Sequence, residues 1–257
     1  MKTILLKLKG PMQSWGTSSH FETRTTDYYP SKSAVIGIIA ASLGYKRDND
    51  EKIQKLNELN FAIRIDQPGV LAKDYHFAIR IDQPEVSAKD YHSAMSCRFP
   101  RVSDVKDQKK YVTNRYYMED AIFIVAISHA DDQWIDSIYH ALQNPYFTPF
   151  MGRRSCPLPA DFIITVTNKD ALDALKNLEW QAAKWYKSKH RNYCADIYAD
   201  KDLNLQGIAT TRNDRVVSFS QKERKFGPRF ETRTSKYFTN CREDASDSNS
   251  LDFYESI

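Results

Sequence analysis

An apolar run near the start of the chain limits most strongly how the rest can fold. Residues 34–41 read AVIGIIAA, so a helix formed there is apolar on every side and has to be covered by other elements. The residues before it, PSKS at 30–33, favour a helix start, and Gly44 favours its end. The sequence therefore predicts a short helix enclosed in the core.

The loop that precedes this helix carries groups suited to a base or a sugar edge. In GPMQSWG at 10–16, two glycines let the backbone turn, and Trp15 offers a flat ring beside the polar groups of Gln13 and Ser14. The alternative is that Trp15 is simply a core residue.

A phosphate site is predicted between this loop and the helix. Arg24 lies in a Thr-flanked extended run, and Lys32 stands beside the free amides of the helix start, with Ser33 next to it. The alternative is that Lys32 is solvated and that Ser31 or Ser33 only caps the helix.

Composition narrows the class of protein. The 257 residues can bury a large core, and the four cysteines are far apart without CxxC or metal-like spacing, so we predict neither disulfides nor a zinc site. We expect no other metal and no cofactor. The longest apolar run is far shorter than the roughly 20 residues of a membrane span, so we expect a cytoplasmic protein without membrane contact. Residues 1–240 carry a net charge of +8 and the chain is 12% aromatic, which favours a polyanion whose bases can stack.

Hydrophobic periodicity gives the order of the elements. Strand patterns occur at 1–9, 61–66, 121–128 and 162–167, and helix patterns follow the first strand (from 31 and from 50) and the third (from 131). The order βαββαβ predicts an α+β, ferredoxin-like (RRM-like) domain over 1–168, whose sheet is a platform for single-stranded RNA. We expect an irregular extension at 169–240, with a short helix at 169–178 and one strand at 216–220, packed on that domain.

Two segments interrupt this order. FAIRIDQPGVLAKDYH at 61–76 is repeated almost unchanged at 77–92, and the sequence leaves open which copy keeps the sheet strand. Residues 93–115 are basic and lack a hydrophobic period, so they should project as a hairpin or arm. The acidic, Ser-rich segment 241–257 is expected to be disordered.

A second polar loop, PYFTPFMGRRSCPLP at 145–159, adds two adjacent arginines. Gly152 lets the backbone approach a partner, and the forked donors of Arg153 and Arg154 suit phosphates or a guanine edge. We predict RNA contact here.

These motifs occur together in one family. The ordered set LxLxGPMQSWG, PSKSAVIGIIAASLG, DYH and PYFTPFMGRRSCPL, over residues 1 to about 167, resembles the CasD family, the "Cas five" subunit of the type I-E CRISPR surveillance complex Cascade. The resemblance implies a non-catalytic, RNA-binding subunit in antiviral defence that caps the 5′ handle of the CRISPR RNA. The implied partners are the backbone subunit CasC, the large subunit CasA, other Cascade subunits and, through the complex, target DNA.

Site residues follow from the resemblance position by position. A protruding thumb at about 93–115 would brace the RNA and CasC. The implied RNA contacts are Gln13, Ser14, Trp15, Arg24, Lys32, Ser33, Tyr91, His92, Arg98, Arg101, Arg115, Arg153, Arg154 and Ser155. Because of the duplication, Tyr75 and His76 compete with Tyr91 and His92 for the family position; the second copy is favoured because it runs directly into the arm.

Two other function classes stay open. A metal-independent endoribonuclease that processes CRISPR precursor RNA, as in type I-C systems, would use a base, an acid and a cation. Lys89, Tyr91 and His92 supply these residue types, as do Lys189 and His190 near Tyr193. In an assembly adaptor, by contrast, the basic loops would meet acidic protein instead of RNA.

Overall fold

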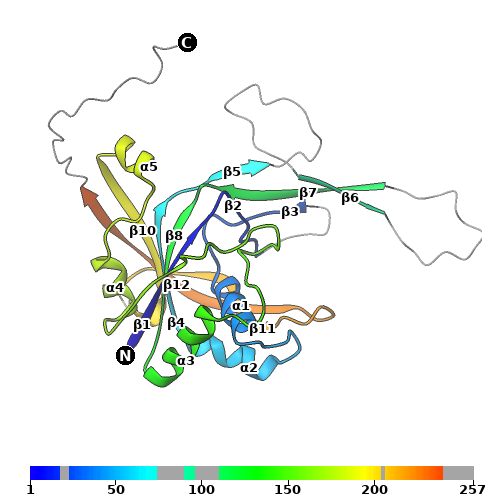
Figure 1. Cartoon of the computed structure of the whole chain (residues 1–257), viewed down its shortest axis with the longest axis horizontal. Helices are drawn as coiled ribbons and strands as arrows, with labels where there is room; N and C mark the ends of the chain where they lie inside the picture. The colour runs from blue at the N-terminus through cyan, green and yellow to red at the C-terminus, as the bar shows by residue number, and fades with distance from the viewer. Residues whose placement is uncertain (18–22, 74–89, 96–109, 204–205, 240–257) are drawn as a thin grey trace, which may run out of the picture.

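The computed structural model describes residues 1–17, 23–73, 90–95, 110–203 and 206–239. It is a mixed α/β structure with two sheets (Figure 1). The larger has seven strands in the order β11-β12-β10-β4-β8-β1-β9, with every neighbouring pair antiparallel. Their bounds are β1 (Lys2–Lys9), β4 (Asn60–Gln67), β8 (Ile122–His129), β9 (Ile163–Thr167), β10 (Asn192–Asp200), β11 (Ala209–Ser218) and β12 (Lys225–Thr239).

Apolar side chains cover both faces of the centre of this sheet. On β1, Ile4, Leu6 and Leu8 belong to the larger core, and Leu5 belongs to a second core on the other face. The side chains of a strand alternate between faces, so burial of both sets makes β1 a central strand, not the half-buried one that its pattern indicates. β8 is buried along nearly its whole length, as its continuous apolar run predicts.

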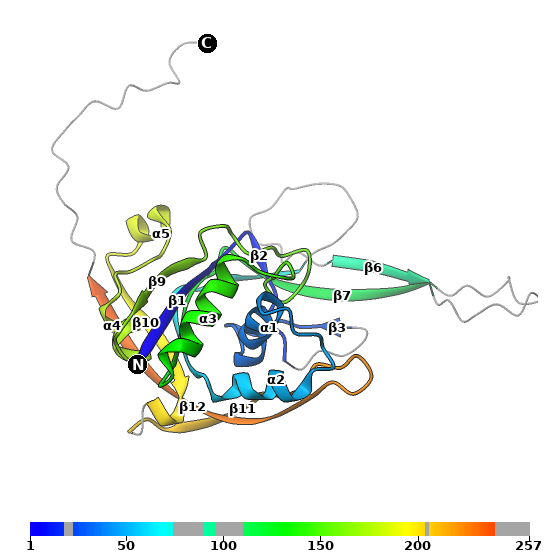
Figure 2. The same cartoon turned by 60° about the horizontal axis from the view of Figure 1, so that its bottom comes forward.

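Helices divide between the two faces. α1 (Lys32–Ser42) and α3 (Asp132–Gln143) pack together over the larger core, and α2 (Asp50–Lys55), followed by the 3-10 turn Leu56–Glu58, lies against β11 (Figures 1 and 2). α4 (Ala171–Asn177) covers the smaller core, and α5 (Lys184–Lys189) follows it on that side. A second 3-10 turn spans Lys201–Leu203. α1 is the enclosed apolar helix that the sequence predicts: Ser31 caps its start by accepting from Ala34 N.

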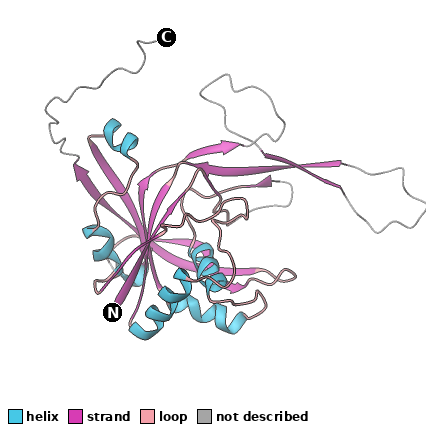
Figure 3. Ribbon diagram, in the orientation of Figure 1, coloured by secondary structure: helices cyan, strands magenta, loops and turns pink. Residues whose placement is uncertain are grey.

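A second sheet of five strands extends away from the body (Figure 3). In it β7 (Lys110–Glu119) pairs with β2 (Met12–Gln13), β3 (Thr23–Arg24), β5 (Val70–Lys73) and β6 (Asp90–Met95). β6 and β7 are antiparallel arms of the segment predicted to project; residues 96–109 lie outside the described residues. The first copy of the duplication supplies β4 and β5, while 74–89 also lies outside them.

The prediction of an irregular extension at 169–240 is wrong for the second half of that segment. Three long strands, β10 to β12, lie between residues 192 and 239 and widen the main sheet beyond β4. The alternation in β10 does not stand out in the sequence because its buried positions include alanines (Ala195, Ala199), whereas tyrosines and acids stand between them. The predicted strand at 216–220 is the end of β11, and the acidic segment 241–257 lies outside the described residues.

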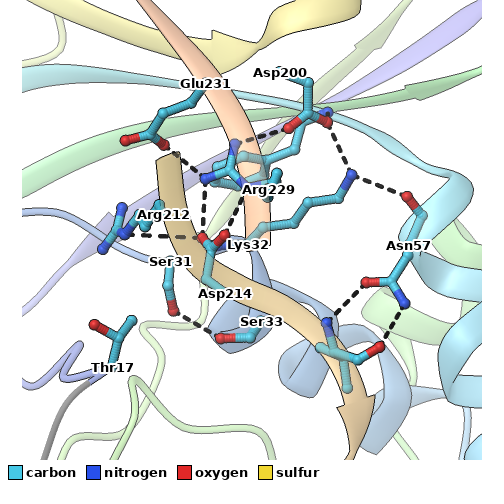
Figure 4. Close-up of polar contacts among 12 residues, drawn as sticks. Thr17, Ser31, Lys32, Ser33, Asn57, Asp200, Arg212, Asp214, Arg229 and Glu231 are labelled. Carbon is cyan, nitrogen blue, oxygen red and sulfur yellow. Dashed lines mark hydrogen bonds and ion pairs between the residues drawn. The ribbon is translucent and has the colours of Figure 1, made fainter. Parts of the chain in front are cut away.

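A buried ionic network joins these late strands to the start of α1 (Figure 4). Arg229 on β12 donates to Asp200 at 2.8 Å, to Asp214 at 2.7 Å and to Glu231 at 2.6 Å. Asp214 also accepts from the backbone N of Lys32 at 2.8 Å. Each buried charge thus has a partner, and the β11–β12 pair holds the first turn of α1 in place.

Among the described residues, no helix is long and apolar enough to cross a membrane.

Candidate nucleic-acid interface

A large cleft opens where the loop after β1, the helix α1, the loop at 147–157 and the β11–β12 turn meet. Its volume is about 970 Å³. Ser14, Trp15, Arg24, Ser33, Arg153 and Arg154, which sequence reasoning took from three separate stretches, all line it. The structure therefore brings the two polar loops together at one concave surface.

The two loops touch through their backbones. Ser14 N donates to Met151 O at 3.2 Å. Gly152 has a φ of 79°, and a Cβ added there would lie 1.6 Å from Ser14 O, so only glycine fits. The partner that Gly152 lets approach is thus this chain's own first loop, and the contact fixes the arginines that follow it.

The charge of the cleft is entirely positive among the described residues. Six cations line it, and no Asp or Glu does. None of these six takes part in an ion pair with a carboxylate in the described part of the chain. They are Arg24, Lys46, Arg47, Arg153, Arg154 and Arg224. Such a surface, with low-dielectric walls, focuses its field on an incoming polyanion.

The guanidinium group of Arg224 is repelled by two others that come from distant segments of the chain. Partial burial, together with repulsion from Arg47 and Arg24, lowers the pKa of Arg224. A bound phosphate would relieve this repulsion, because it would place negative charge among the three groups.

Arg153 is held in place but not neutralised. Its Nη2 donates to Arg24 O at 3.0 Å, and its guanidinium carbon lies 4.4 Å from the centre of the Tyr117 ring. Its Nη1 is buried without a hydrogen-bond partner, as is Nε of Arg115, whose Cα pairs with that of Arg24 where β3 meets β7. Buried donors of this kind are costly unless a ligand completes them.

For Trp15 the structure favours the alternative that the sequence left open, that of a core residue. Its side chain is 1% exposed, and its Nε1 donates to Gln13 Oε1 at 3.0 Å. Gln13 in turn donates to Ala121 O at 2.7 Å and is fully buried, and Ser14 is 4% exposed. Trp15 is a core residue whose edge reaches the cleft, so stacking of a base on its face is at odds with the structure.

Exposed aromatic rings lie elsewhere at the cleft. Phe147 lines it and is 42% exposed; Tyr146, its edge-to-face neighbour, is 75% exposed. Their backbone nitrogens donate to Ser42 O and Ala41 O, which anchors both residues on the end of α1. Sequence reasoning missed them, although PYF follows the α3 pattern directly and a run of apolar rings outside a periodic segment was the available signal.

Lys32 is not available to a phosphate in this structure. Its Nζ donates to Asp200 Oδ2 at 2.8 Å and to Asn57 O at 3.0 Å, and the residue is 6% exposed (Figure 4). Burial lowers the pKa of Lys32, and the nearby Asp200 opposes that shift. Its charge is compensated internally, which corrects the prediction. Ser33 lines the cleft, but its hydroxyl is shared with Ser31 Oγ at 3.0 Å.

The remaining predicted residues lie beside or beyond the cleft. Arg154 and Ser155 are exposed in the second loop, and Ser155 Oγ is 3.9 Å from Cys156 Sγ. Tyr91 and His92 lie on β6, opposite Asn114 and Thr113 of β7. Arg98 and Arg101, like Lys89 of the enzyme alternative, lie outside the described residues.

In the other candidate catalytic group, Lys189, His190 and Tyr193, two side chains have structural contacts within the protein. Tyr193 OH donates to Ile65 O at 2.9 Å, and the His190 ring stacks on Tyr186 with centroids 4.0 Å apart. No group of three or more His, Cys, Asp or Glu placed to hold a metal ion occurs among the described residues.

Comparison with known proteins gives one family. Residues 3–231 match the family model described as CRISPR-associated protein (Cas_Cas5). The chain is 34% identical over 229 residues to the CRISPR system Cascade subunit CasD of Escherichia coli (strain K12), covering 83% of this chain and 88% of that protein.

Solved structures agree with this match. A chain of a structure titled CRISPR RNA-guided surveillance complex superposes with a TM-score of 0.69 at 27% identity, covering 92% of this chain and 91% of that one. A second, titled Crystal structure of Cas protein, gives a TM-score of 0.58 at 25% identity, covering 91% and 94%.

Proposed function

The chain belongs to the Cas5 family of CRISPR-associated proteins, and from that premise we propose that it is an RNA-binding subunit of a type I-E Cascade surveillance complex. Its ligand there is the 5′ handle of the CRISPR RNA, which it caps. The observation that carries the proposal is the cleft of about 970 Å³, which six cations line and to which no described carboxylate contributes.

The cleft suits single-stranded RNA in particular. Arg24, Arg47 and Arg224 bind the backbone as one group, and Arg153 and Arg154 bind it from the second loop. Phe147 and Tyr146 offer faces on which bases stack. Trp15 has an indirect role, because its buried ring and its hydrogen bond to Gln13 support the first loop.

The fold arrangement is consistent with this role. Strands β4-β8-β1-β9, with α1 and α3 on one face, have the strand order and antiparallel pairing of a ferredoxin-like domain. We assign residues 1–168 to this palm and the β6–β7 pair to the thumb. The thumb then braces the RNA and contacts CasC, while the body contacts CasA.

We further propose that the role is non-catalytic. The tyrosine hydroxyl of the Lys189, His190 and Tyr193 group donates to a backbone carbonyl, and His190 is stacked. The endoribonuclease alternative rests on Tyr91 and His92. If purified protein cleaves its repeat RNA in EDTA and His92→Ala abolishes cleavage, the non-catalytic assignment fails.

The decisive experiment compares two removals of the same charge. Complex purified through a tagged subunit is assayed for bound CRISPR RNA after Arg153→Ala/Arg154→Ala, and after Lys222→Ala/Lys225→Ala. The two lysines are exposed and line a different, smaller cavity. We expect the arginine pair to lose about 1–3 kcal/mol of RNA binding per charge and the lysine pair to retain it. Undiminished RNA in the arginine variant would favour the adaptor alternative, in which the loops meet acidic protein.

A further inference from the structure

A second positively charged surface lies around α5, away from the cleft. We define the α5 surface as Lys184, Trp185, Lys187, Lys189 and Arg191. From residue 180 to 195 the chain contains four cations and no carboxylate. Figures 1 and 2 show α5 and α1 on opposite sides of the central strands, so the α5 surface is separate from the cleft.

The base of this surface is a rigid stack of rings. Trp180 stacks on Tyr193 of β10 at 5.1 Å and on Phe238 of β12 at 5.9 Å, both nearly parallel. Tyr186 of α5 meets Trp180 and Tyr193 edge-on. α5 has only six residues and would be marginal alone, so this stack, rather than helix propensity, holds it in place.

Cations and an exposed ring cover the outside of α5. Trp185 is 51% exposed, and Lys189 Nζ lies 5.5 Å from its ring centre. Lys184, Lys189 and Arg191 form no ion pair in the described part of the chain. Burial, repulsion from Lys9 and a smaller repulsion from Lys187 lower the pKa of Lys7, while Asp161 and Asp66 oppose that shift. Because Lys184, Lys189 and Arg191 have no carboxylate partner in the described part of the chain, a neighbouring anion would stabilise the α5 surface.

The chain's own acidic segment is attached beside this surface. Thr239, the last residue of β12, pairs with Asn192, which follows Lys189 by three positions. Residues 241–257 contain five carboxylates against one arginine. Glu243 is four residues beyond Thr239, or at most about 13–14 Å of extended chain, while α5 is about 9 Å long. The tether also gives the segment an effective concentration near the millimolar range at this site.

We propose that residues 241–257 dock on the α5 surface. Their carboxylates pair with Lys184, Lys189 and Arg191, and the apolar side chains of Phe253 and Tyr254 are available to cover Trp185. The segment acts as an internal polyanion that keeps nucleic acid and acidic proteins off the α5 surface. This inference does not depend on what the cleft binds.

The first test follows Trp185 in the full chain. Its fluorescence is the difference between the native chain and Trp185→Phe. We expect the combined change Glu243→Gln, Asp244→Asn, Asp247→Asn, Asp252→Asn and Glu255→Gln to red-shift that emission and to raise its quenching by acrylamide about twofold, because the ring loses its cover. About 1 M NaCl, where the Debye length is about 3 Å, should do the same to the native chain.

A control removes carboxylates from another exposed region. Asp48→Asn, Glu51→Gln and Glu58→Gln alter α2 and its surroundings, on the α1 side of the sheet, and should leave Trp185 quenching unchanged. An unchanged signal in the five-site variant, or an equal change in the control, overturns the proposal.

A second measurement does not depend on tryptophan. Carbodiimide joins a carboxylate to a lysine amine when the two are in contact. Mass spectrometry of the coupled full chain should identify links from Glu243 or Asp244 to Lys184 or Lys189. These links should not form when the coupling is carried out at high salt. The proposal fails if the links form only to lysines elsewhere, such as Lys46 of the cleft. It also fails if Lys184 and Lys189 couple only to carboxylates of an added partner subunit, or if only added nucleic acid blocks their coupling.

Discussion

Single residues decide where charge can meet a ligand, and here sequence reasoning was partly right. It brought Arg24, Arg153 and Arg154 into one site, and the structure places all three in the cleft. It missed Arg47 and Arg224 because each lies in a turn without a motif, and only the fold brings residue 224 beside residue 47. It left open that Trp15 is a core residue, as the structure has it, and it did not foresee the buried ion pair of Lys32, since residue type does not tell which way a side chain turns.

Arg224 offers a test at this scale. Arg224→Ala should weaken RNA binding by about 1–3 kcal/mol and reduce the slope of log affinity against log salt by about 1, since one phosphate contact is lost. Lys222→Ala, on the same turn but outside the cleft, should change neither. The measurement is RNA binding by the assembled complex over a series of salt concentrations; equal slopes for the two variants would remove Arg224 from the site.

Gly152 provides a second residue-scale prediction. Gly152→Ala places a Cβ 1.6 Å from Ser14 O at a positive φ, so the two loops must separate. We expect a loss of about 1–3 kcal/mol in the free energy of unfolding, as for other strained backbone positions, with weaker RNA binding. In Gly227→Ala the new Cβ would meet only Val217, at 3.7 Å, so this control should unfold almost as the native chain does in denaturant titrations.

Elements were predicted best where periodicity is strong. β1, β4, β8, β9, α1, α3 and α4 lie close to their predicted places, because each carries a clear apolar pattern. β10 to β12 were largely missed, since their buried positions include charged residues such as Asp200, Asp214 and Arg229. A hydrophobic pattern cannot reveal strands whose inward groups are partnered ions, because the pairing is visible only after folding.

The ionic network gives the test at the scale of elements. Asp214 is fully buried and accepts from Arg229 and from Lys32 N, so Asp214→Asn leaves the Arg229 charge undercompensated. We expect a loss of about 3–5 kcal/mol in the free energy of unfolding, as when one partner of a buried pair is removed. Because the β11–β12 pair and the start of α1 loosen together, RNA binding should fall as well.

The matched control for this change is an exposed ion pair. Asp196 pairs with Arg233 at 2.8 Å on the same sheet, but the Arg233 side chain is 64% exposed. Asp196→Asn should therefore cost no more than about 1 kcal/mol in the same denaturant titration. Similar losses for the two variants would mean that the network around Arg229 does not hold the late strands to α1.

The whole molecule separates two cationic surfaces by its central sheet. The cleft lies over α1, and the α5 surface lies beyond α4 on the other face (Figure 1). The net charge does not tell which of the two surfaces binds RNA, since both contribute to the formal +4 of the chain. Removing charge from one surface at a time does tell, because an exposed charge acts mainly within a Debye length of about 8–10 Å at ordinary salt concentrations.

Two double variants remove the same amount of charge from the two surfaces. The net charge falls from +4 to +2 both in Lys184→Gln/Lys189→Gln and in Arg153→Ala/Arg154→Ala. If RNA is bound by local contacts in the cleft, only the arginine variant loses it, and the lysine variant keeps the native RNA content and the native salt slope. If the overall field of the protein attracts the RNA, both variants lose it to a similar degree. Quantifying RNA per complex for both variants at two salt concentrations separates these outcomes, because a long-range field weakens with salt in both proteins, whereas a missing contact stays missing at low salt.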